Sequence, residues 1–118
     1  MYVRRVALDF QMIKGSVSMM VLGLLATSDM YGYQIIRELS ERSNEAFDFK
    51  EGTLYPVLHE MEKKQFIESY WERTTLKRKR KYYLITERGR ESLQEKLNDW
   101  QNVVQAVGTV ILSLKLEE

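Results

Sequence analysis

Hydrophobic residues in the first third of the chain recur with the period of a helix. Between residues 13 and 26 they follow the i, i+3, i+4 pattern and also fill intermediate positions, which is typical of a helix buried on more than one side. The polar residues 27–29 interrupt this helix, and Asp29 is a plausible N-cap for the next one. The buried side of that second helix should carry Ile35, Ile36 and Leu39.

The same pattern predicts two further helical segments. Residues 1–12 are weakly amphipathic and predict a short leading helix. After Gly52, a third helix is expected to have Thr53 as its cap and Pro56 in its first turn, where a missing N–H removes no helical hydrogen bond. The core-facing residues of this helix should be Leu54, Leu58 and Met61.

Beyond residue 64 the hydrophobic period changes from that of a helix to that of a strand. Residues 67–72 and 82–85 alternate in character and are rich in aromatic and β-branched types, so they predict two strands paired as a hairpin. The basic residues 77–81 would lie at the hairpin tip and on the first part of the returning strand. The connection is long and has neither glycine nor proline, and Thr86 follows as the cap of a last helix.

The last helix carries a heptad repeat, because its apolar residues are spaced alternately by four and three positions. A helix over residues 88–116 would be over about 40 Å long, which is more than a domain of this size can cover. The seam is therefore expected to form the interface of a homodimer, and packing within one chain is the alternative. The predicted dimer contacts are Leu93, Leu97, Trp100, Val104, Val107, Ile111 and Leu114.

Composition narrows the class of protein. A chain of 118 residues with 44% hydrophobic and 30% charged residues is about one folded domain. The absence of cysteine removes disulfides and thiolate metal sites and fits a cytoplasmic protein. The longest apolar stretch, residues 17–26, is about half of the roughly 20 residues of a membrane-spanning helix, so no membrane association is expected.

The charge is distributed unevenly along the chain. The net charge is only +1, yet residues 63–90 hold ten basic and three acidic residues, a local net charge of +7. A polyanion such as DNA would meet a basic patch there. A solvated charged loop without a partner is the alternative interpretation of such a run.

These elements predict a mainly α protein with a small β-hairpin, a winged helix-turn-helix over residues 1–86 followed by a long C-terminal dimerisation helix over residues 87–118. In this fold the third helix enters the major groove of double-stranded DNA, and the cations of the hairpin, or wing, neutralise phosphates. Packing or simple exposure is the alternative role for Tyr55 and His59. The predicted DNA contacts are Tyr33, Thr53, Tyr55, Pro56, His59, Lys63, Lys77, Arg78, Lys79, Arg80 and Lys81.

Three segments of the chain resemble a known family. They are YGYQII over residues 31–36, GTLYPVLHEME over residues 52–62 and KYYLITERG over residues 81–89. In this order and spacing they look like the PadR family of bacterial transcriptional regulators, and the resemblance extends over about residues 15–100. It implies a dimer that binds a palindromic operator and usually represses transcription until an effector binds.

The resemblance also implies a place for the effector. In some small members of the family a tryptophan on the last helix faces its symmetry mate across a central pore, where flat aromatic compounds stack, and Trp100 matches that place. The adaptable apolar side chains of Met12, Met19 and Val104 would line the same cavity. The alternative is that Trp100 only packs in the dimer interface.

No catalytic constellation is evident in the sequence. The chain has one histidine and no cysteine, and it shows no glycine-rich phosphate loop and no metal-binding spacing, so we expect neither an enzyme nor a metal or other cofactor. Two classes of function remain. The first is a DNA-binding repressor released by a small apolar or aromatic effector, and the second is a winged-helix protein–protein interaction module with weak, nonspecific DNA binding. The basic wing favours the repressor.

Overall fold

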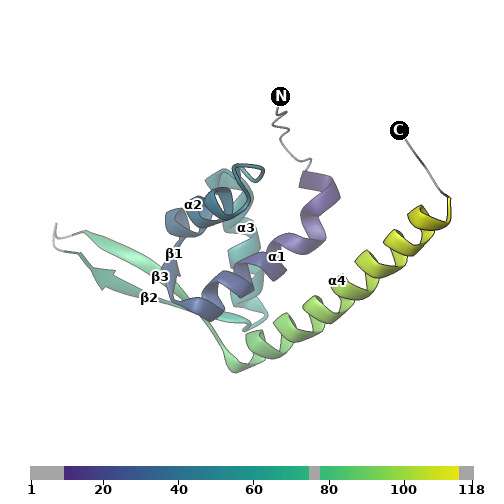
Figure 1. Ribbon diagram of the computed structural model, residues 1–118. Helices are drawn as coiled ribbons and strands as arrows, with labels where there is room; N and C mark the ends of the chain where they lie inside the picture. Colours follow the sequence, from purple (N-terminus) through teal and green to yellow (C-terminus); the bar gives the residue numbers. More distant parts are fainter. Residues whose placement is uncertain (1–9, 75–77, 115–118) are drawn as a thin grey trace.

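The computed structural model describes residues 10–74 and 78–114, and for residues 10–14 it describes the backbone alone. Most of the leading helix predicted over residues 1–12 lies outside this part of the chain. The elements follow one another as predicted, helices first, then a hairpin, then a long helix (Figure 1). They are α1 (Phe10–Thr27), β1 (Met30–Tyr31), α2 (Gly32–Arg42), α3 (Glu51–Lys63), β2 (Ile67–Arg73), β3 (Lys79–Ile85) and α4 (Glu87–Ser113).

The core forms where α1, α2, α3 and the base of the sheet meet. In α1 the described side chains between residues 16 and 26 are all buried or partly buried, as its nearly continuous apolar sequence predicts. The predicted core face of α3 is confirmed, and in α2 the side chain of Ile36 is only partly buried while its neighbours on the stripe are fully buried. The buried hydrophobic side chains of α2 and α3 are Ile35, Leu39, Leu54, Leu58 and Met61.

The sheet has three antiparallel strands in the order β1-β3-β2. The predicted hairpin is confirmed, but its strands extend further, because Arg73 pairs with Lys79 and only residues 74–78 connect them. Strand β1 was not predicted. It places Met30 opposite Tyr83 and Tyr31 opposite Tyr82, so that the start of α2 is joined to the base of the wing.

The prediction that Asp29 caps α2 is wrong. The residues after Asp29 stay extended because they pair with β3, and the helix starts only at Gly32 with Tyr31 in the N-cap position. The Asp29 carboxylate instead accepts a hydrogen bond of 2.8 Å from the hydroxyl of Tyr70 on β2. Asp29, although its side chain is of a type that often caps helices, thus takes part in a tertiary contact instead.

The start of α3 also differs from the prediction. The helix begins at Glu51 with Lys50 in the N-cap position, and the amide of Thr53 donates to the Lys50 carbonyl over 3.0 Å, so Thr53 is not the cap. Pro56 consequently lies in the second turn rather than the first. Because proline lacks an N–H, the carbonyl of Gly52 has no donor at the i+4 position.

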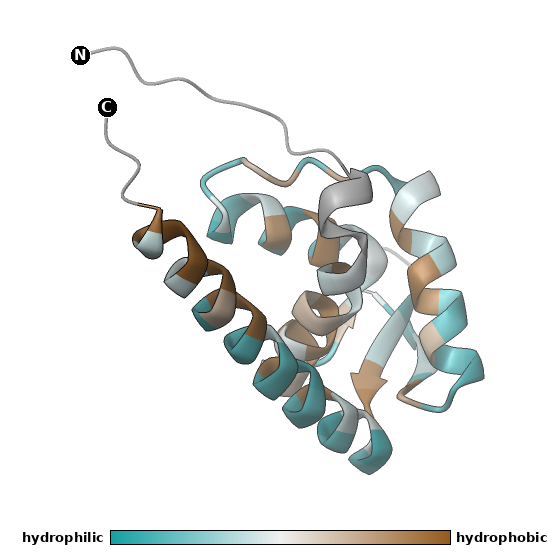
Figure 2. Cartoon of the chain, turned by 90° about the vertical axis from the view of Figure 1, so that its right-hand side faces the viewer, coloured by the Kyte–Doolittle hydropathy of each residue, from teal (hydrophilic) through white to brown (hydrophobic). Residues whose placement is uncertain are grey.

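Helix α4 begins as the sequence predicts, since the Thr86 hydroxyl accepts a hydrogen bond of 2.9 Å from the amide of Gly89. Its first turns pack against the core through Leu93, and the 27-residue helix, about 40 Å long, then diverges from α1 (Figure 1). Hydrophobic residues concentrate in its C-terminal half (Figure 2). In the part of the chain that the structure describes, none of the helices is both long and apolar enough to span a membrane.

Candidate nucleic-acid interface

The side of α3 that faces away from the core is exposed, as the DNA-binding prediction requires. Tyr55, His59 and Lys63 follow one another at i, i+4 and i+8 on this side and are all exposed. Thr53 and Pro56 belong to a different face, because both line a cavity that α3 shares with α1 and α4. The structure therefore brings together three of the five residues predicted on this helix.

Tyr55 combines an exposed ring with a close contact at its hydroxyl end. It is 39% exposed, and the hydroxyl lies against Gly32 in the first turn of α2, where a Cβ atom would clash with it. Partial burial, with the nearby carboxylate of Glu51 as a smaller cause, raises the pKa of Tyr55. The phenol is therefore neutral near pH 7, and it can donate a hydrogen bond to a phosphate or a base edge.

The wing carries the predicted cations on strand β3 and its tip. Arg78 and Lys79 are exposed, whereas Lys77 lies outside the described residues. The guanidinium of Arg80 lies 4.4 Å from the ring centre of Tyr31, a cation–π contact worth about 0.5–1 kcal/mol at an exposed site. This contact limits the orientations of Arg80 without neutralising its charge.

Lys81 is engaged within the protein more than the other wing cations. Its ammonium lies 3.8 Å from a carboxylate oxygen of Glu62 on α3 and 5.5 Å from the ring centre of Tyr83. The same Glu62 side chain accepts a hydrogen bond of 2.6 Å from Ser69 on β2. Glu62 therefore ties the last turn of α3 to both strands of the wing, and Lys81 has less of its charge available for DNA than Lys79.

A stack of tyrosines that the sequence did not predict supports the wing. The rings of Tyr70 and Tyr82 are stacked with centres 5.7 Å apart, and Tyr82 meets Tyr31 edge to face at 5.5 Å. The hydrogen bond to Asp29 raises the pKa of Tyr70 to about 12. The available signal was a tyrosine in each of the two predicted strands, Tyr70 and Tyr82, but the pairing of β1 with β3 has no local signature.

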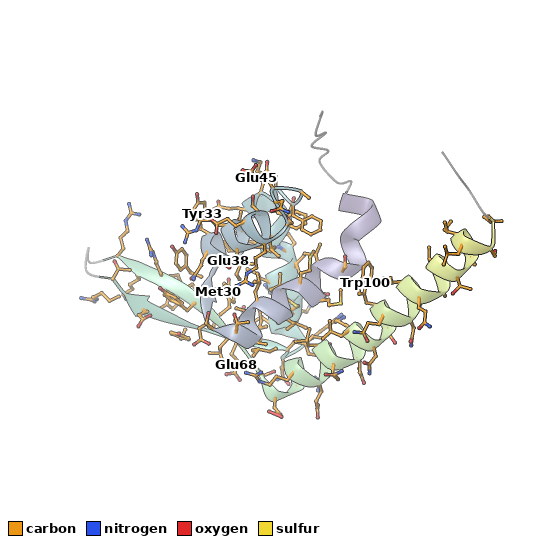
Figure 3. The ribbon with its side chains drawn as sticks, viewed as in Figure 1. Met30, Tyr33, Glu38, Glu45, Glu68 and Trp100 are labelled. Carbon is orange, nitrogen blue, oxygen red and sulfur yellow. The ribbon has the colours of Figure 1, made fainter. Side chains whose placement is uncertain are left out.

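Tyr33 lies in the first turn of α2, and the guanidinium of Arg37 is 5.9 Å from its ring centre. The side chain is 56% exposed, and in Figure 3 it extends from the end of α2 that is next to the wing. The exposed tyrosine and the adjacent arginine thus extend the candidate interface from α3 and the wing onto α2.

The predicted dimer seam is exposed in the single chain. Leu93 packs against the core, but the other seam residues are 36–57% exposed although they are apolar. Trp100 is 49% exposed and lies on the side of α4 that faces α1 (Figure 3). Exposed apolar surface of this extent on one helix marks an interaction site. The exposed seam residues are Leu97, Trp100, Val104, Val107, Ile111 and Leu114.

The predicted effector residues are not gathered in one cavity of the single chain. Met19 is 9% exposed, so most of its side chain is covered by the protein itself, whereas Trp100 and Val104 are half-exposed. The side chain of Met12 lies outside the described residues. Among the described residues there is also no cluster of three histidine or acidic side chains that could hold a metal ion.

The sequence and the fold match those of transcriptional regulators. Residues 21–95 match the model of the transcriptional regulator PadR-like family. The chain is 40% identical over 95 residues to an uncharacterised protein of Lysinibacillus sphaericus, an alignment that covers 80% of this chain and 87% of that protein.

Two solved structures have a fold similar to that of this chain. A transcriptional regulator from Clostridium thermocellum is 31% identical with a TM-score of 0.78, covering 84% of this chain and 96% of that one. A PadR-like transcriptional regulator from Bacillus cereus is 33% identical with a TM-score of 0.76, covering 86% and 96%. The predicted winged-helix fold is confirmed, and so is the prediction of a protein that is not an enzyme. The chain belongs to the PadR-like family of DNA-binding transcriptional regulators.

Proposed function

We propose that the protein acts in the cytoplasm as a homodimeric repressor that binds a palindromic operator and is released by a small apolar or aromatic effector. The observation that carries the proposal is the exposed face of α3 beside a basic wing. Tyr55, His59 and Lys63 supply donors and acceptors for base edges, while Arg78 and Lys79 supply charge for the flanking phosphates. Specificity and affinity then come from two neighbouring elements.

The proposed dimer follows from the second half of α4. This helix continues beyond the region where the domain supports it, and its exposed apolar seam would be buried by the same seam of a second copy. Residues 1–86 would then be the DNA-binding unit and residues 87–118 the dimerisation helix. A two-fold axis between the copies requires two half-sites related by the same symmetry, which makes the operator palindromic.

The proposed effector would act at that axis. Trp100 is half-exposed on α4 near α1, and its symmetry mate would supply a second indole. A flat aromatic compound between the two rings would have apolar neighbours in Met12, Met19 and Val104. Binding there would change the distance between the α3 helices of the two copies, which are the proposed recognition helices. The affinity for the operator would change as a result.

A salt titration of duplex binding tests the proposal. A repressor of this kind keeps its preference for one sequence as salt removes the phosphate contribution, because hydrogen bonds to base edges do not release counterions. If the affinities for all duplexes instead fall in parallel as the salt concentration rises, the proposal is contradicted. That result would favour a protein–protein interaction module with a phosphate-binding patch.

A further inference from the structure

The two long strands of the wing give it two faces of different character. Residues directly opposite each other in an antiparallel pair point to the same face of the sheet, and so do alternate residues along a strand. One of these faces, the inner face, lies toward the helices, since Tyr83 is a core residue and Ser69 donates a hydrogen bond to Glu62 on α3. The cross-strand pairs of the inner face are Ser69 with Tyr83, Trp71 with Lys81 and Arg73 with Lys79.

The charges of the two faces are arranged differently. On the outer face Glu72 lies opposite Arg80, so opposite charges meet across the strands. On the inner face Arg73 lies opposite Lys79, both side chains are exposed, and neither has an acidic partner among residues 10–74 and 78–114. Like charges directly opposite each other destabilise an antiparallel pair. An anion bound to the inner face would remove this repulsion.

Trp71 lies beside these cations on the inner face and is mostly uncovered. Its side chain is 64% exposed, more than any other described tyrosine or tryptophan. The ammonium of Lys81, its cross-strand neighbour, lies 3.8 Å from Glu62 and 5.5 Å from the ring centre of Tyr83. An exposed indole next to free cations suits a partner that presents apolar C–H surface and anionic groups side by side. The sugars and phosphates along a DNA groove present both.

The inner face also extends far enough to reach a second groove of the DNA. Ser69 contacts Glu62 on α3, and the four further residues to Arg73 extend about 13 Å from there at about 3.3 Å per residue. With a helix radius of about 5 Å, Arg73 is then roughly 18 Å from the axis of α3. The minor groove next to an occupied major groove lies half a helical turn away, about 17 Å.

We propose that the inner face of the wing binds the minor groove beside each half-site, where Arg73 enters the groove, Trp71 packs against the sugars of its wall and Lys79 contacts a phosphate. A narrow, A·T-rich minor groove has an enhanced negative potential that attracts arginine. The protein therefore prefers A·T pairs beside its half-sites, and it selects them by the shape of the groove. The inference rests on the proposed function in one respect, because it requires α3 to lie in the major groove.

The first test compares three duplexes that share one centre and differ only in their flanks. The flanks are A·T pairs, G·C pairs or inosine·C pairs, and inosine lacks the minor-groove amino group of guanine while its major-groove acceptors are the same. The centre is the sequence recovered from a random library, or a mixed sequence where none is recovered. We expect the A·T and inosine duplexes to bind at least about fivefold more tightly than the G·C duplex. Equal affinities for all three, or an inosine duplex that behaves like the G·C duplex, would overturn the proposal.

Matched variants on the two faces locate the contact. Arg73→Gln and Trp71→Val should each reduce the flank preference to less than about twofold, because the groove loses its arginine or the indole that positions it. Arg80→Gln removes the same charge from the outer face and should weaken binding to all three duplexes alike. Melting temperatures show whether each variant is folded. A preference that survives in both inner-face variants, or that disappears in Arg80→Gln, would overturn the assignment to the inner face.

Fluorescence measures the contact of Trp71 directly. The chain has two tryptophans, so in Trp100→Phe the tryptophan emission comes from Trp71 alone. Saturation with the A·T-flanked duplex should remove most of the quenching of this emission by acrylamide, because DNA would cover the indole. Quenching that is the same with and without the duplex would overturn the contact.

The outcomes also separate this site from the proposed function. If the library yields no preferred centre but the flank preference and the shielding of Trp71 remain, sequence reading by α3 fails and the wing site stands. If a palindrome is recovered but its flanks have no effect and Trp71 stays accessible, the proposed function stands and the wing site is overturned.

Discussion

At the scale of single residues, the candidate interface depends on side chains that join elements distant in sequence. Asp29 follows α1 and Tyr70 lies on β2, yet the two are joined by a hydrogen bond of 2.8 Å. Glu62 makes a comparable connection from α3 to Ser69 and Lys81 in the wing. These polar contacts therefore add to the packing of Ile67, Tyr83 and Ile85 in the core, which joins the base of the wing to α3.

The first prediction concerns the ionisation of Tyr70. Its pKa is raised from 10 to about 12, chiefly by the hydrogen bond to Asp29, so the proton is held more tightly in the folded protein. The resulting stabilisation is complete below pH 10 and is lost as the pH rises towards 12. Asp29→Asn should lower the highest tyrosine pKa in an ultraviolet titration, while Asp48→Asn, at another exposed carboxylate, should leave it unchanged. An unchanged titration in Asp29→Asn would show that the contact is absent in solution.

The second prediction concerns sequence reading by Tyr55. Its exposed ring faces away from the core on α3, so Tyr55→Ala should reduce affinity mainly for the preferred duplex, by roughly 1–3 kcal/mol as for a lost base contact. Competition binding against a scrambled duplex measures this. Because Tyr55 also touches Gly32, Tyr55→Phe serves as a control that keeps the packing of the ring. Undiminished discrimination in Tyr55→Ala would remove the residue from the reading role.

At the scale of elements, local sequence patterns predicted which helices and strands form better than they predicted where the helices begin. The core face of α3, the hairpin and the Thr86 cap of α4 follow from periodicity and capping chemistry, and all three are present. The start of α2 was misplaced because the pairing of β1 with β3 outweighs capping preference. Helix α3 has its N-cap at Lys50 rather than Thr53, and the hydrogen bonds at this end of the helix are local. Residues 30 and 31 pair with strand β3 some fifty positions later, and nothing near them in sequence signals that pairing.

The joint between β3 and α4 leads to the third prediction. Gly89 is buried, and a Cβ there would clash with the carbonyl oxygen of Phe66 and lie 2.8 Å from the Cγ1 atom of Ile85. Since a backbone carbonyl cannot move aside easily, Gly89→Ala should lower the free energy of unfolding by about 1–3 kcal/mol. Gly108→Ala, in the same helix with open space around it, should raise it by up to about 1 kcal/mol. Denaturant titrations measure the free energy of unfolding of both variants. Equal changes in the two would mean that the contact of Gly89 with Phe66 and Ile85 is less close than described.

The wing as an element leads to the fourth prediction. Replacing Lys79 and Arg80 with alanine should weaken binding to all duplexes alike and flatten the salt dependence by roughly 3–4 in log–log slope, because the dimer loses two phosphate contacts from each of its two wings. Arg88→Ala with Arg90→Ala removes the same charge from α4, at the opposite end of the hairpin from its tip, and should change the slope little. A specific loss at one sequence only would show that the wing reads bases.

At the scale of the whole molecule, the long helix α4 and its exposed apolar surface are the features on which the proposed dimer rests. The chain extends 58 × 36 × 22 Å, and α4 diverges from the helical domain with apolar residues along its C-terminal half (Figures 1 and 2). The heptad spacing predicted this surface from the sequence alone. The cavity behind α3 had no such signature, because its walls come from three helices that only the fold brings together.

The fifth prediction tests the seam. Val104→Glu with Val107→Glu should give the mass of a monomer in light scattering, because the interface would have to bury unpaired charges. Operator affinity should fall on the order of 10²-fold or more, since two half-sites are no longer linked. Asn102→Glu with Gln105→Glu adds the same charges to the other side of α4 and should stay dimeric. A dimer that survives the valine changes would show that the seam is misassigned.

The measurement that tests the central claim most directly is a selection from a random duplex library at physiological salt, with the mass of the free protein determined alongside. Recovery of a palindrome by a dimer is the predicted result, and its half-site spacing gives the separation of the two recognition helices. Failure to enrich any sequence, together with binding that vanishes as salt rises, would contradict the claim, because the basic wing would then bind phosphates without any reading by α3.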